Sequence, residues 1–228
     1  MLSAMTLHIG LLLYPALTQL DLTGPYELFT RIPDATVHTV WKTTDVVRAD
    51  SGLALVPSTT IDACPPLDVI FVPGGRGQIP VMQDAPVLAF VRDHGARAKW
   101  VTSVCTGSLI LGAAGLLNGY KATSHWAFRE LLPMFGAELA DGRVVVDRNR
   151  VTAGGVTAGI DFGLTLVAEM AGADRAKAAQ LEIEYDPAPP FACGHPSTAD
   201  AHVVAAVRAA IEERFQQRKA QIRAMTGA

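Results

Sequence analysis

The 228-residue sequence has little of what marks several protein classes. Its 3 cysteines have no Cys-x-x-Cys spacing, so a disulfide framework is not expected and a reducing compartment fits best. Its 19 basic residues against 22 acidic ones give no electrostatic footprint for nucleic acid. No apolar run approaches the roughly 18 residues of a membrane span, and the N-terminus lacks the basic region of a signal peptide. We therefore expect a soluble, cytoplasmic protein that binds neither nucleic acid nor membranes.

Metal-binding patterns are also missing. No His-x-x-x-His pair, Cys-x-x-Cys pair or acidic cluster has the spacing of metal ligands, so no metal site is expected. Among the 6 histidines, His125 stands beside Trp126 near an expected helix start. A structural role is favoured there over that of a catalytic base, although the sequence leaves a part in catalysis open.

Apolar runs and helical patterns alternate through most of the chain, and 50% of the residues are hydrophobic, which allows a large core. Strands are expected at 7–14, 37–42, 67–72 and 99–104, with an edge or hairpin strand at 53–56 and a hairpin at 142–152. Helices are expected near 18–29, 80–96, 109–114, 126–132, 157–168, 174–185 and 198–224. This alternation predicts a single-domain, three-layer α/β/α sandwich with a mostly parallel, flavodoxin-like sheet.

The organising feature is a cysteine at the end of an expected buried strand. Cys105 is followed by Thr106, Gly107 and Ser108, and then by a helical pattern. This arrangement predicts a nucleophile elbow, in which a sharp strand-to-helix turn presents the thiol. A helix N-terminus has free N–H groups and a partial positive charge, which favour the thiolate. The alternative is a buried structural cysteine.

Three other candidates should lie with Cys105, because parallel sheets place ligands at the carboxyl ends of their strands. Asp21 could exchange a proton with a substrate beside the thiol, or could simply interact with the N–H groups of its own helix. Gly74 and Gly75 could bring backbone N–H groups to developing charge, or form only a turn. Thr106 could orient a ligand or cap the following helix.

The end of the chain is expected to be a helical extension. A Pro-rich run at 186–190 predicts a rigid connector, so we divide the chain into a domain at 1–192 and an extension at 193–228 that packs on that domain or on a dimer partner. Arg208, Arg214, Arg218, Lys219 and Arg223 are interleaved with acidic residues, which indicates a solvated helix face. Cys64 and Cys193 lie near prolines and lack the elbow pattern, so they are expected to be incidental.

Several segments together resemble a known family. They are Gln19-Leu-Asp-Leu-Thr-Gly-Pro25, Pro73-Gly-Gly75, Ser103-Val-Cys-Thr-Gly-Ser108, Thr157-Ala-Gly-Ile-Asp-Phe162 and Tyr185-Asp-Pro-Ala-Pro-Pro-Phe191. The glycine pair and the cysteine turn resemble the ThiJ/PfpI superfamily, which is related to class I glutamine amidotransferase domains. Asp21, the Cys-Thr pair and the Pro-rich segment resemble the isocyanide (isonitrile) hydratases within it. Protease-like relatives carry a histidine where this chain has Thr106, and deglycase-like relatives carry a glutamate where it has Asp21.

The resemblance implies an enzyme that adds water to an isocyanide to give an N-substituted formamide. It implies that Cys105 is the nucleophile of a covalent thioimidate intermediate and that Asp21 is the general acid and base. Thr106 would orient the reacting groups, and the N–H groups of Gly75 and Thr106 would stabilise charge near bound substrate, with Gly74 beside them. The resemblance also implies no cofactor and a homodimer.

Two other functions remain open. A thiol at such a turn could serve a redox or ligand sensor, or a glyoxalase- or deglycase-like enzyme could use the same cysteine. Related transcription regulators append a helix-turn-helix module, for which about 37 residues after Phe191 are too few.

Overall fold

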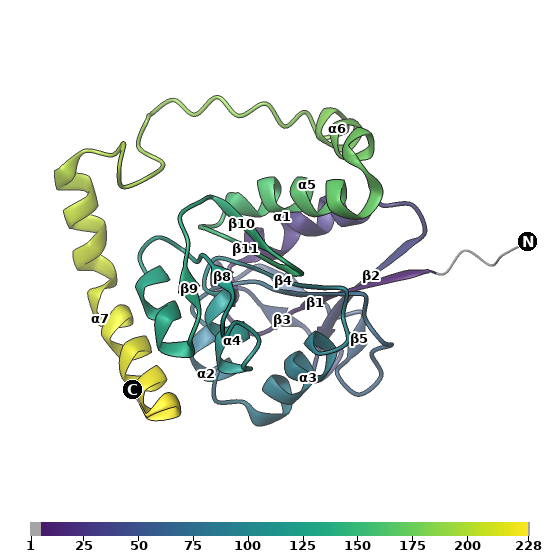
Figure 1. Ribbon diagram of the computed structural model, residues 1–228, viewed down its shortest axis with the longest axis horizontal. Helices are drawn as coiled ribbons and strands as arrows, with labels where there is room; N and C mark the ends of the chain where they lie inside the picture. Colours follow the sequence, from purple (N-terminus) through teal and green to yellow (C-terminus); the bar gives the residue numbers. More distant parts are fainter. Residues whose placement is uncertain (1–5, 228) are drawn as a thin grey trace, which may run out of the picture.

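The centre of the fold is a seven-stranded sheet within residues 6–227, the part of the chain that the computed structural model describes (Figure 1). Its strand order is β10-β11-β7-β6-β1-β2-β5. Neighbouring strands are parallel except that β10 runs antiparallel to β11. The strands are β1 (Leu7–Leu12), β2 (Ala35–Trp41), β5 (Thr59–Thr60), β6 (Val69–Val72), β7 (Trp100–Val104), β10 (Val144–Asp147) and β11 (Arg150–Ala153).

Helices cover both faces of the sheet, which confirms the predicted three-layer α/β/α sandwich (Figure 1). One face carries α1 (Gln19–Phe29) and α5 (Ala158–Ala171), with α6 (Ala173–Glu182) packed on α5. The other face carries α2 (Gln78–Val81), α3 (Ala85–Gly95) and α4 (Gly107–Ala113). The sequence produces this arrangement because the central strands are apolar on both sides, and each side needs a helical layer to exclude water.

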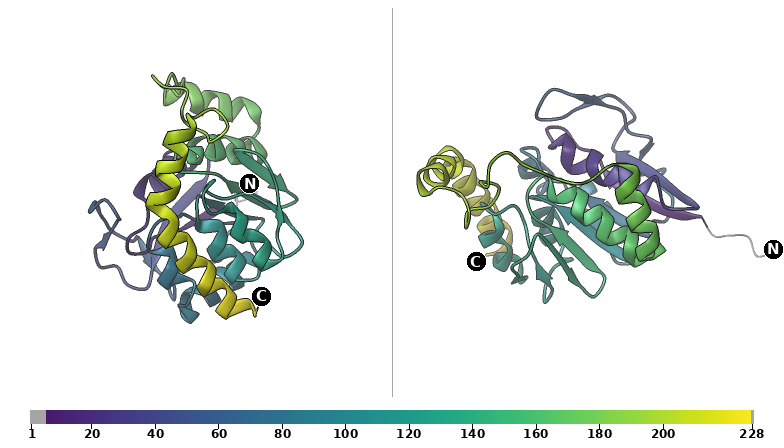
Figure 2. Two further views of the ribbon diagram at one scale, coloured as in Figure 1. Left: turned by 90° about the vertical axis from the view of Figure 1, so that its left-hand side faces the viewer. Right: turned by 90° about the horizontal axis from the view of Figure 1, so that it is seen from above.

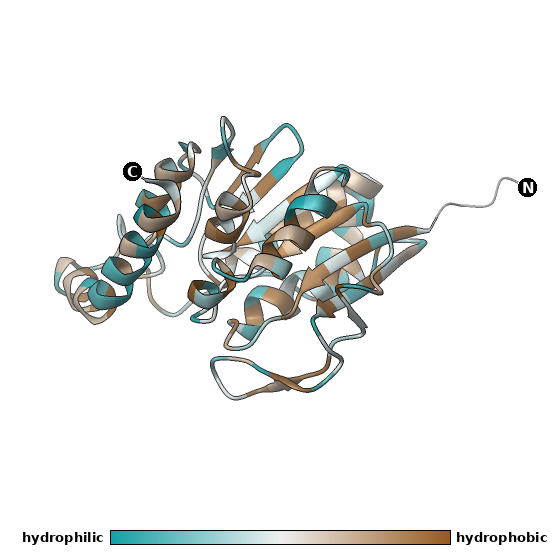
Figure 3. Cartoon of the chain, turned by 90° about the horizontal axis from the view of Figure 1, so that it is seen from below, coloured by the Kyte–Doolittle hydropathy of each residue, from teal (hydrophilic) through white to brown (hydrophobic). Residues whose placement is uncertain are grey.

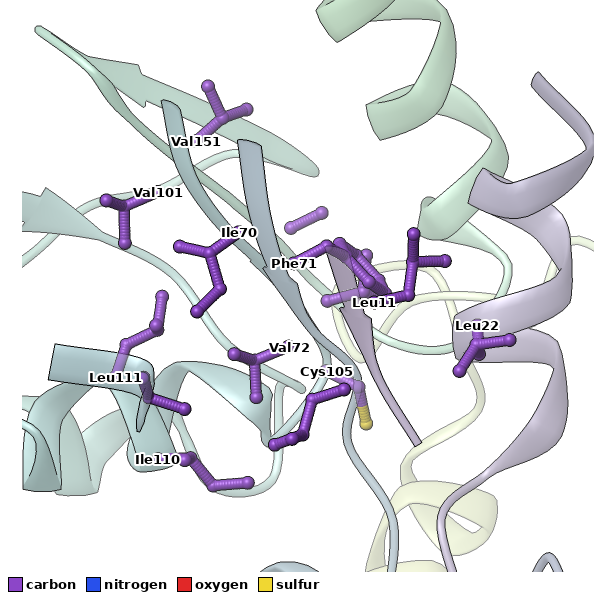
Figure 4. Packing of buried hydrophobic residues seen from close by; sticks show 14 of the residues in the cluster. Leu11, Leu22, Ile70, Phe71, Val72, Val101, Cys105, Ile110, Leu111 and Val151 are labelled. Carbon is purple, nitrogen blue, oxygen red and sulfur yellow. The ribbon is translucent and has the colours of Figure 1, made fainter. Parts of the chain in front are cut away.

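The alternation of side chains along β6 shows how one strand supplies both layers of the core. All its residues are buried. Ile70 and Val72 point toward Ile110 and Leu111 of α4, whereas Phe71 points toward the α1 side (Figure 4). The strands of the central sheet are accordingly mostly hydrophobic, whereas the outer helices carry hydrophilic stretches (Figure 3).

The segment expected at 53–56 as an edge or hairpin strand belongs to a hairpin, in which β3 (Val47–Arg48) pairs with β4 (Ala54–Leu55) apart from the main sheet. Other short elements differ from the expectations. The helix expected at 126–132 is a 3-10 helix, η1 (Arg129–Phe135), which Pro133 and the left-handed Gly136 limit to a short run. The sequence did not predict three two-residue strands, because they are too short to give a periodic pattern. They are β5 and the paired strands β8 (Lys121–Ala122) and β9 (Glu138–Leu139).

The strand order places three loops side by side at one edge of the sheet. Counted along the main parallel strands, β2-β1-β6-β7-β11 follows the doubly wound order 2-1-3-4-5, whose ligand crevice lies where the order reverses. Here that point lies between β1 and β6. Asp21, Gly74 and Cys105 follow the adjacent strands β1, β6 and β7, so the topology alone brings them to one edge.

Helix α7 (Ala201–Thr226) lies across one side of the molecule, after an irregular connector along its edge (Figures 1 and 2). Its C-terminal half packs on the same chain, where Phe215 stacks on Phe128 of the loop before η1 and where Arg218, Gln221 and Ile222 are buried. The expectation of a wholly solvated basic face is therefore wrong at Arg218, which is only 2% exposed. Within residues 6–227, no helix combines the length and apolar character needed to cross a membrane.

The contact between α1 and α5 fixes the helix that carries Asp21. A Cβ at Gly159 would lie 3.2 Å from Cδ of Pro25, whose ring cannot move aside as a flexible side chain could. We therefore expect Gly159→Leu to lower the free energy of unfolding by about 1–3 kcal/mol through overpacking. Denaturant unfolding checks this, with Glu169→Leu on the exposed side of α5 as the control, for which a change within about 0.5 kcal/mol is expected. Equal effects of the two substitutions would contradict the close packing.

Candidate active site

Cys105 stands at a strained turn between β7 and α4. Its φ of 56° lies in the left-handed region, which costs a non-glycine residue about 1–3 kcal/mol. Hydrogen bonds hold this conformation: the Cys105 N–H donates to Gly154 O at 2.8 Å, and the Cys105 carbonyl accepts from Ser124 Oγ at 2.9 Å and Ser108 Oγ at 3.2 Å. The predicted elbow is thus present, and its thiol projects at the strand end (Figure 4).

Asp21 is a fully buried carboxyl group, with 0% of its surface exposed. Its Oδ2 accepts a hydrogen bond from the Gly74 N–H at 2.9 Å. Its Oδ1 has no hydrogen-bond partner within the described residues. The carboxyl group is therefore held by the loop after β6 and not by the N-terminus of its own helix.

The glycine pair joins the other parts of the site. The Gly75 N–H donates to Thr106 Oγ1 at 3.1 Å, and the Gly74 carbonyl accepts from the Thr18 N–H at 3.0 Å. Both N–H groups of the pair thus have side-chain acceptors, and in this arrangement they position Asp21 and Thr106. The expected contact of the Gly75 N–H with charge at the thiol is not available, because Thr106 occupies it.

Only glycine fits at either position of the pair. A Cβ at Gly74 would lie 2.5 Å from the Thr106 nitrogen and 2.8 Å from the Cys105 Cβ. Gly75 has a φ of 137°, and a Cβ there would lie 2.4 Å from the Thr18 nitrogen. The loop can therefore approach the cysteine turn on one side and α1 on the other.

Burial dominates the protonation of the two reactive groups. The Cys105 thiol is 6% exposed, and burial followed by the neighbouring Asp21 raises its pKa well above its usual range, against the lowering effects of the Thr106 N–H and Arg218. Burial raises the pKa of Asp21 to about 7, although the Gly74 N–H and the interaction with Cys105 lower it. The helix N-terminus therefore does not make a thiolate the resting form. Thiol and carboxyl group titrate as one coupled pair.

A cavity of about 290 Å³ opens at Cys105 and Thr106. Its wall includes apolar side chains from three separate parts of the chain, and two arginines from α7. They are Trp126, Phe128, Val156, Val207, Ile211, Arg214 and Arg218. His125 also lines it, and burial together with the two arginines lowers the pKa of its imidazole to about 4, so the ring is neutral at pH 7.

Arg218 is the residue of this site that the sequence did not indicate. The basic pattern of α7 contains several arginines, and no local feature distinguishes the buried one from its exposed neighbours. Arg218 Nη2 donates to the Gly75 carbonyl at 3.2 Å. Gln221, three residues later, is also buried, so the structure turns this face of α7 inward, which no signal in the sequence indicates.

A larger groove of about 1000 Å³ lies at the opposite, N-terminal edge of the parallel strands, with His8, Cys64 and His94 in its wall. None of Asp21, Gly75, Cys105 and Thr106 lines it. Within residues 6–227, no group of three or more His, Cys, Asp or Glu side chains is placed to hold a metal ion. The strained cysteine, which lines the smaller cavity and interacts with the buried carboxyl group of Asp21, marks that cavity as the candidate active site.

The fold and the cysteine turn define the class. Residues 8–169 match the DJ-1/PfpI family model, and the chain belongs to the DJ-1/PfpI family.

Three known proteins show what this chain is similar to. A Pseudomonas putida protein named isonitrile hydratase is 56% identical over 200 residues, which cover 88% of each chain. A crystal structure of a ThiJ/PfpI family protein from Pseudomonas syringae superposes with a TM-score of 0.93 at 51% identity, covering 94% of this chain and 90% of that one. Deglycase PfpI of Pyrococcus furiosus is 32% identical over 47% of this chain and 66% of its own length.

Burial of Asp21 makes a prediction about stability. Between its usual pKa of 3.8 and about 7, the carboxyl group stays protonated in the folded chain but ionises in the unfolded one. The folded state then binds more protons, so this group lowers the free energy of unfolding as pH rises through that range, by at most about 4 kcal/mol. We expect Asp21→Asn to be more stable than wild type at pH 8, with the difference vanishing near pH 3.

Urea unfolding of both proteins at several pH values measures that difference. Asp174→Asn, at a fully exposed position, is the control and should follow wild type throughout. A constant difference between Asp21→Asn and wild type from pH 3 to 8 would contradict the raised pKa.

Proposed function

We propose that this protein is an enzyme that hydrates isocyanides to N-substituted formamides, R–N≡C + H2O → R–NH–CHO. The observation that carries the proposal is the interaction of Cys105, which lines the cavity, with the buried carboxyl group of Asp21 behind it. Its presence in a chain 56% identical to an isonitrile hydratase selects the substrate class. The terminal carbon of an isocyanide must gain a nucleophile and a proton, and a thiol beside a carboxyl group supplies both.

In the first step, Asp21 accepts the thiol proton as Cys105 attacks the terminal carbon, forming an S–C bond. The same carboxyl group then gives that proton to the carbon, and the product is a thioimidate, Cys–S–CH=N–R. The pKa of about 7 at Asp21 suits this exchange, since a carboxyl group poised near neutral pH both accepts and returns a proton.

In the second step, water replaces the thiol. Asp21 removes a proton from water as the water oxygen bonds to the thioimidate carbon, and it passes that proton to the nitrogen, which gives Cys–S–CH(OH)–NH–R. The S–C bond then breaks as the hydroxyl oxygen forms the carbonyl, Asp21 carries the hydroxyl proton to the Cys105 sulfur, and the formamide leaves. Thr106 keeps this geometry through its bond with the Gly75 N–H. The apolar wall around Trp126 and Ile211 receives the R group, which favours aryl and alkyl isocyanides.

The burial of Cys105 disfavours a peroxide sensor. Oxidation of such sensors requires an accessible thiolate, whereas Cys105 is 6% exposed and has a raised pKa. A deglycase-like activity is disfavoured because deglycase-like relatives carry a glutamate as the carboxyl partner of the cysteine, whereas this chain has the shorter Asp21.

The hydratase predicts a sharp dependence on two side chains. Purified protein incubated with an aryl isocyanide should release the formamide, which chromatography quantifies. Cys105→Ala should lose this turnover, and Asp21→Asn should lower kcat by about 10²–10⁴-fold, as expected for a lost general acid and base. Mass spectrometry of Asp21→Asn after brief exposure checks for an adduct with the mass of the isocyanide.

Cys193→Ala is the matched control, because Cys193 is an exposed free cysteine outside the cavity at Cys105. It should retain wild-type turnover. Turnover by Cys105→Ala at the wild-type rate would contradict the proposed mechanism. An inactive wild type whose Cys105 is oxidised readily by peroxide would favour the sensor.

A further inference from the structure

We propose that Arg218 of the C-terminal helix is a positioning residue of the active site, which fixes the Gly75 carbonyl and places a buried positive charge in the wall of the cavity at Cys105. Its kinetic consequence rests on the proposed hydratase function, whereas its effect on the thiol does not. Arg218 lies 113 positions after Cys105 in the chain, and the fold brings both to one cavity.

The guanidinium is held by an unusual set of partners. Arg218 Nε donates to Gln78 Oε1 at 2.6 Å, Nη2 donates to the Gly75 carbonyl at 3.2 Å, and the group stacks over the Phe128 ring at 4.2 Å. Nη1 has no hydrogen-bond partner within the described residues. No ion pair joins Arg218 to a carboxylate in residues 6–227.

An unpaired cation that is 2% exposed is a costly feature for stability alone. An arginine that only anchored a helix would destabilise the fold less at the surface or beside a carboxylate. The arrangement makes sense where a positive charge is needed next to a group that becomes negative. Cys105 is such a group when it attacks.

The backbone link to the site runs through the two residues of the glycine pair. The Gly75 carbonyl accepts from Arg218, and the Gly75 N–H donates to Thr106 Oγ1. The preceding N–H, on Gly74, holds the Asp21 carboxylate. The bond from Arg218 to the Gly75 carbonyl therefore restrains the loop whose N–H groups hold Thr106 and Asp21.

The positive charge of Arg218 also favours the thiolate form of Cys105. Arg218 lowers the pKa of the Cys105 thiol, partly offsetting burial and Asp21. Burial, and then the neighbouring Arg214, lower the pKa of Arg218 to about 10, while Cys105 and Tyr14 raise it, so the guanidinium is protonated at pH 7. His125 is neutral there and adds no competing charge.

Gln221 offers a matched control. It lies on the same buried face of α7, and its Nε2 donates to the Ile79 carbonyl at 2.5 Å, so it anchors the helix to the same α2 segment. It does not line the cavity at Cys105. A role limited to docking α7 would make Arg218→Met and Gln221→Met behave alike.

The test measures alkylation of Cys105 by iodoacetamide against pH, in a Cys64→Ser, Cys193→Ser background so that one thiol reports. We expect Arg218→Met to slow alkylation at pH 7 about tenfold, because the thiolate loses its neighbouring cation. Arg218→Lys should keep the alkylation profile near wild type but lower kcat/KM for the isocyanide, because an ammonium cannot reproduce the forked bonds to Gly75 and Gln78. Gln221→Met should leave both unchanged, apart from lower thermal stability.

Equal alkylation profiles for Arg218→Met and Gln221→Met would overturn the charge role. Wild-type kcat/KM in Arg218→Lys would overturn the positioning role, and this variant serves should Arg218→Met fail to fold. A wild-type protein without isocyanide turnover would refute the proposed function, and the alkylation profiles would still decide whether Arg218 acts on Cys105.

Discussion

The hydrogen bond from the Gly74 N–H to Asp21 is the contact on which the site depends, because it holds a carboxyl group where water does not reach. Removing that N–H would leave the carboxylate buried without a hydrogen bond from the described backbone. The bond requires Gly74 to approach the cysteine turn more closely than any residue with a Cβ could. The glycine loop, the cysteine turn and the start of α1 are thus mutually constrained.

These constraints oppose stability. Cys105 adopts a left-handed φ, Asp21 carries a desolvated carboxyl group, and Arg218 is a buried cation without an ion-pair partner in the described chain. The burial of apolar side chains on both faces of the sheet, as along β6, compensates for these unfavourable contributions to stability. Functional sites commonly concentrate such unfavourable features, since a relaxed site would lack the poised charges that chemistry uses.

The sequence predicted the sheet, its covering helices and the neighbourhood of Asp21, Gly74 and Cys105, because apolar strands and the positions just after them follow a regular topology. It did not predict the very short strands or the 3-10 form of η1, which leave no periodic signal. It also missed Arg218. Burial of one arginine among several on a basic helix depends on a tertiary contact with Gly75 and Gln78, and no local pattern encodes that contact. The raised pKa of Cys105 likewise comes from packing, which outweighs the helix terminus.

The placement of Arg218 on the last helix makes the cavity depend on both ends of the chain. The cysteine turn and the buried carboxyl group lie before residue 170, whereas α7 (Ala201–Thr226) supplies Val207, Ile211, Arg214 and Arg218 to the cavity wall. A chain without this helix would lack that part of the wall and the cationic donor to the Gly75 carbonyl. The size and charge of the cavity are therefore set by a segment almost a hundred residues away from the cysteine turn in the sequence.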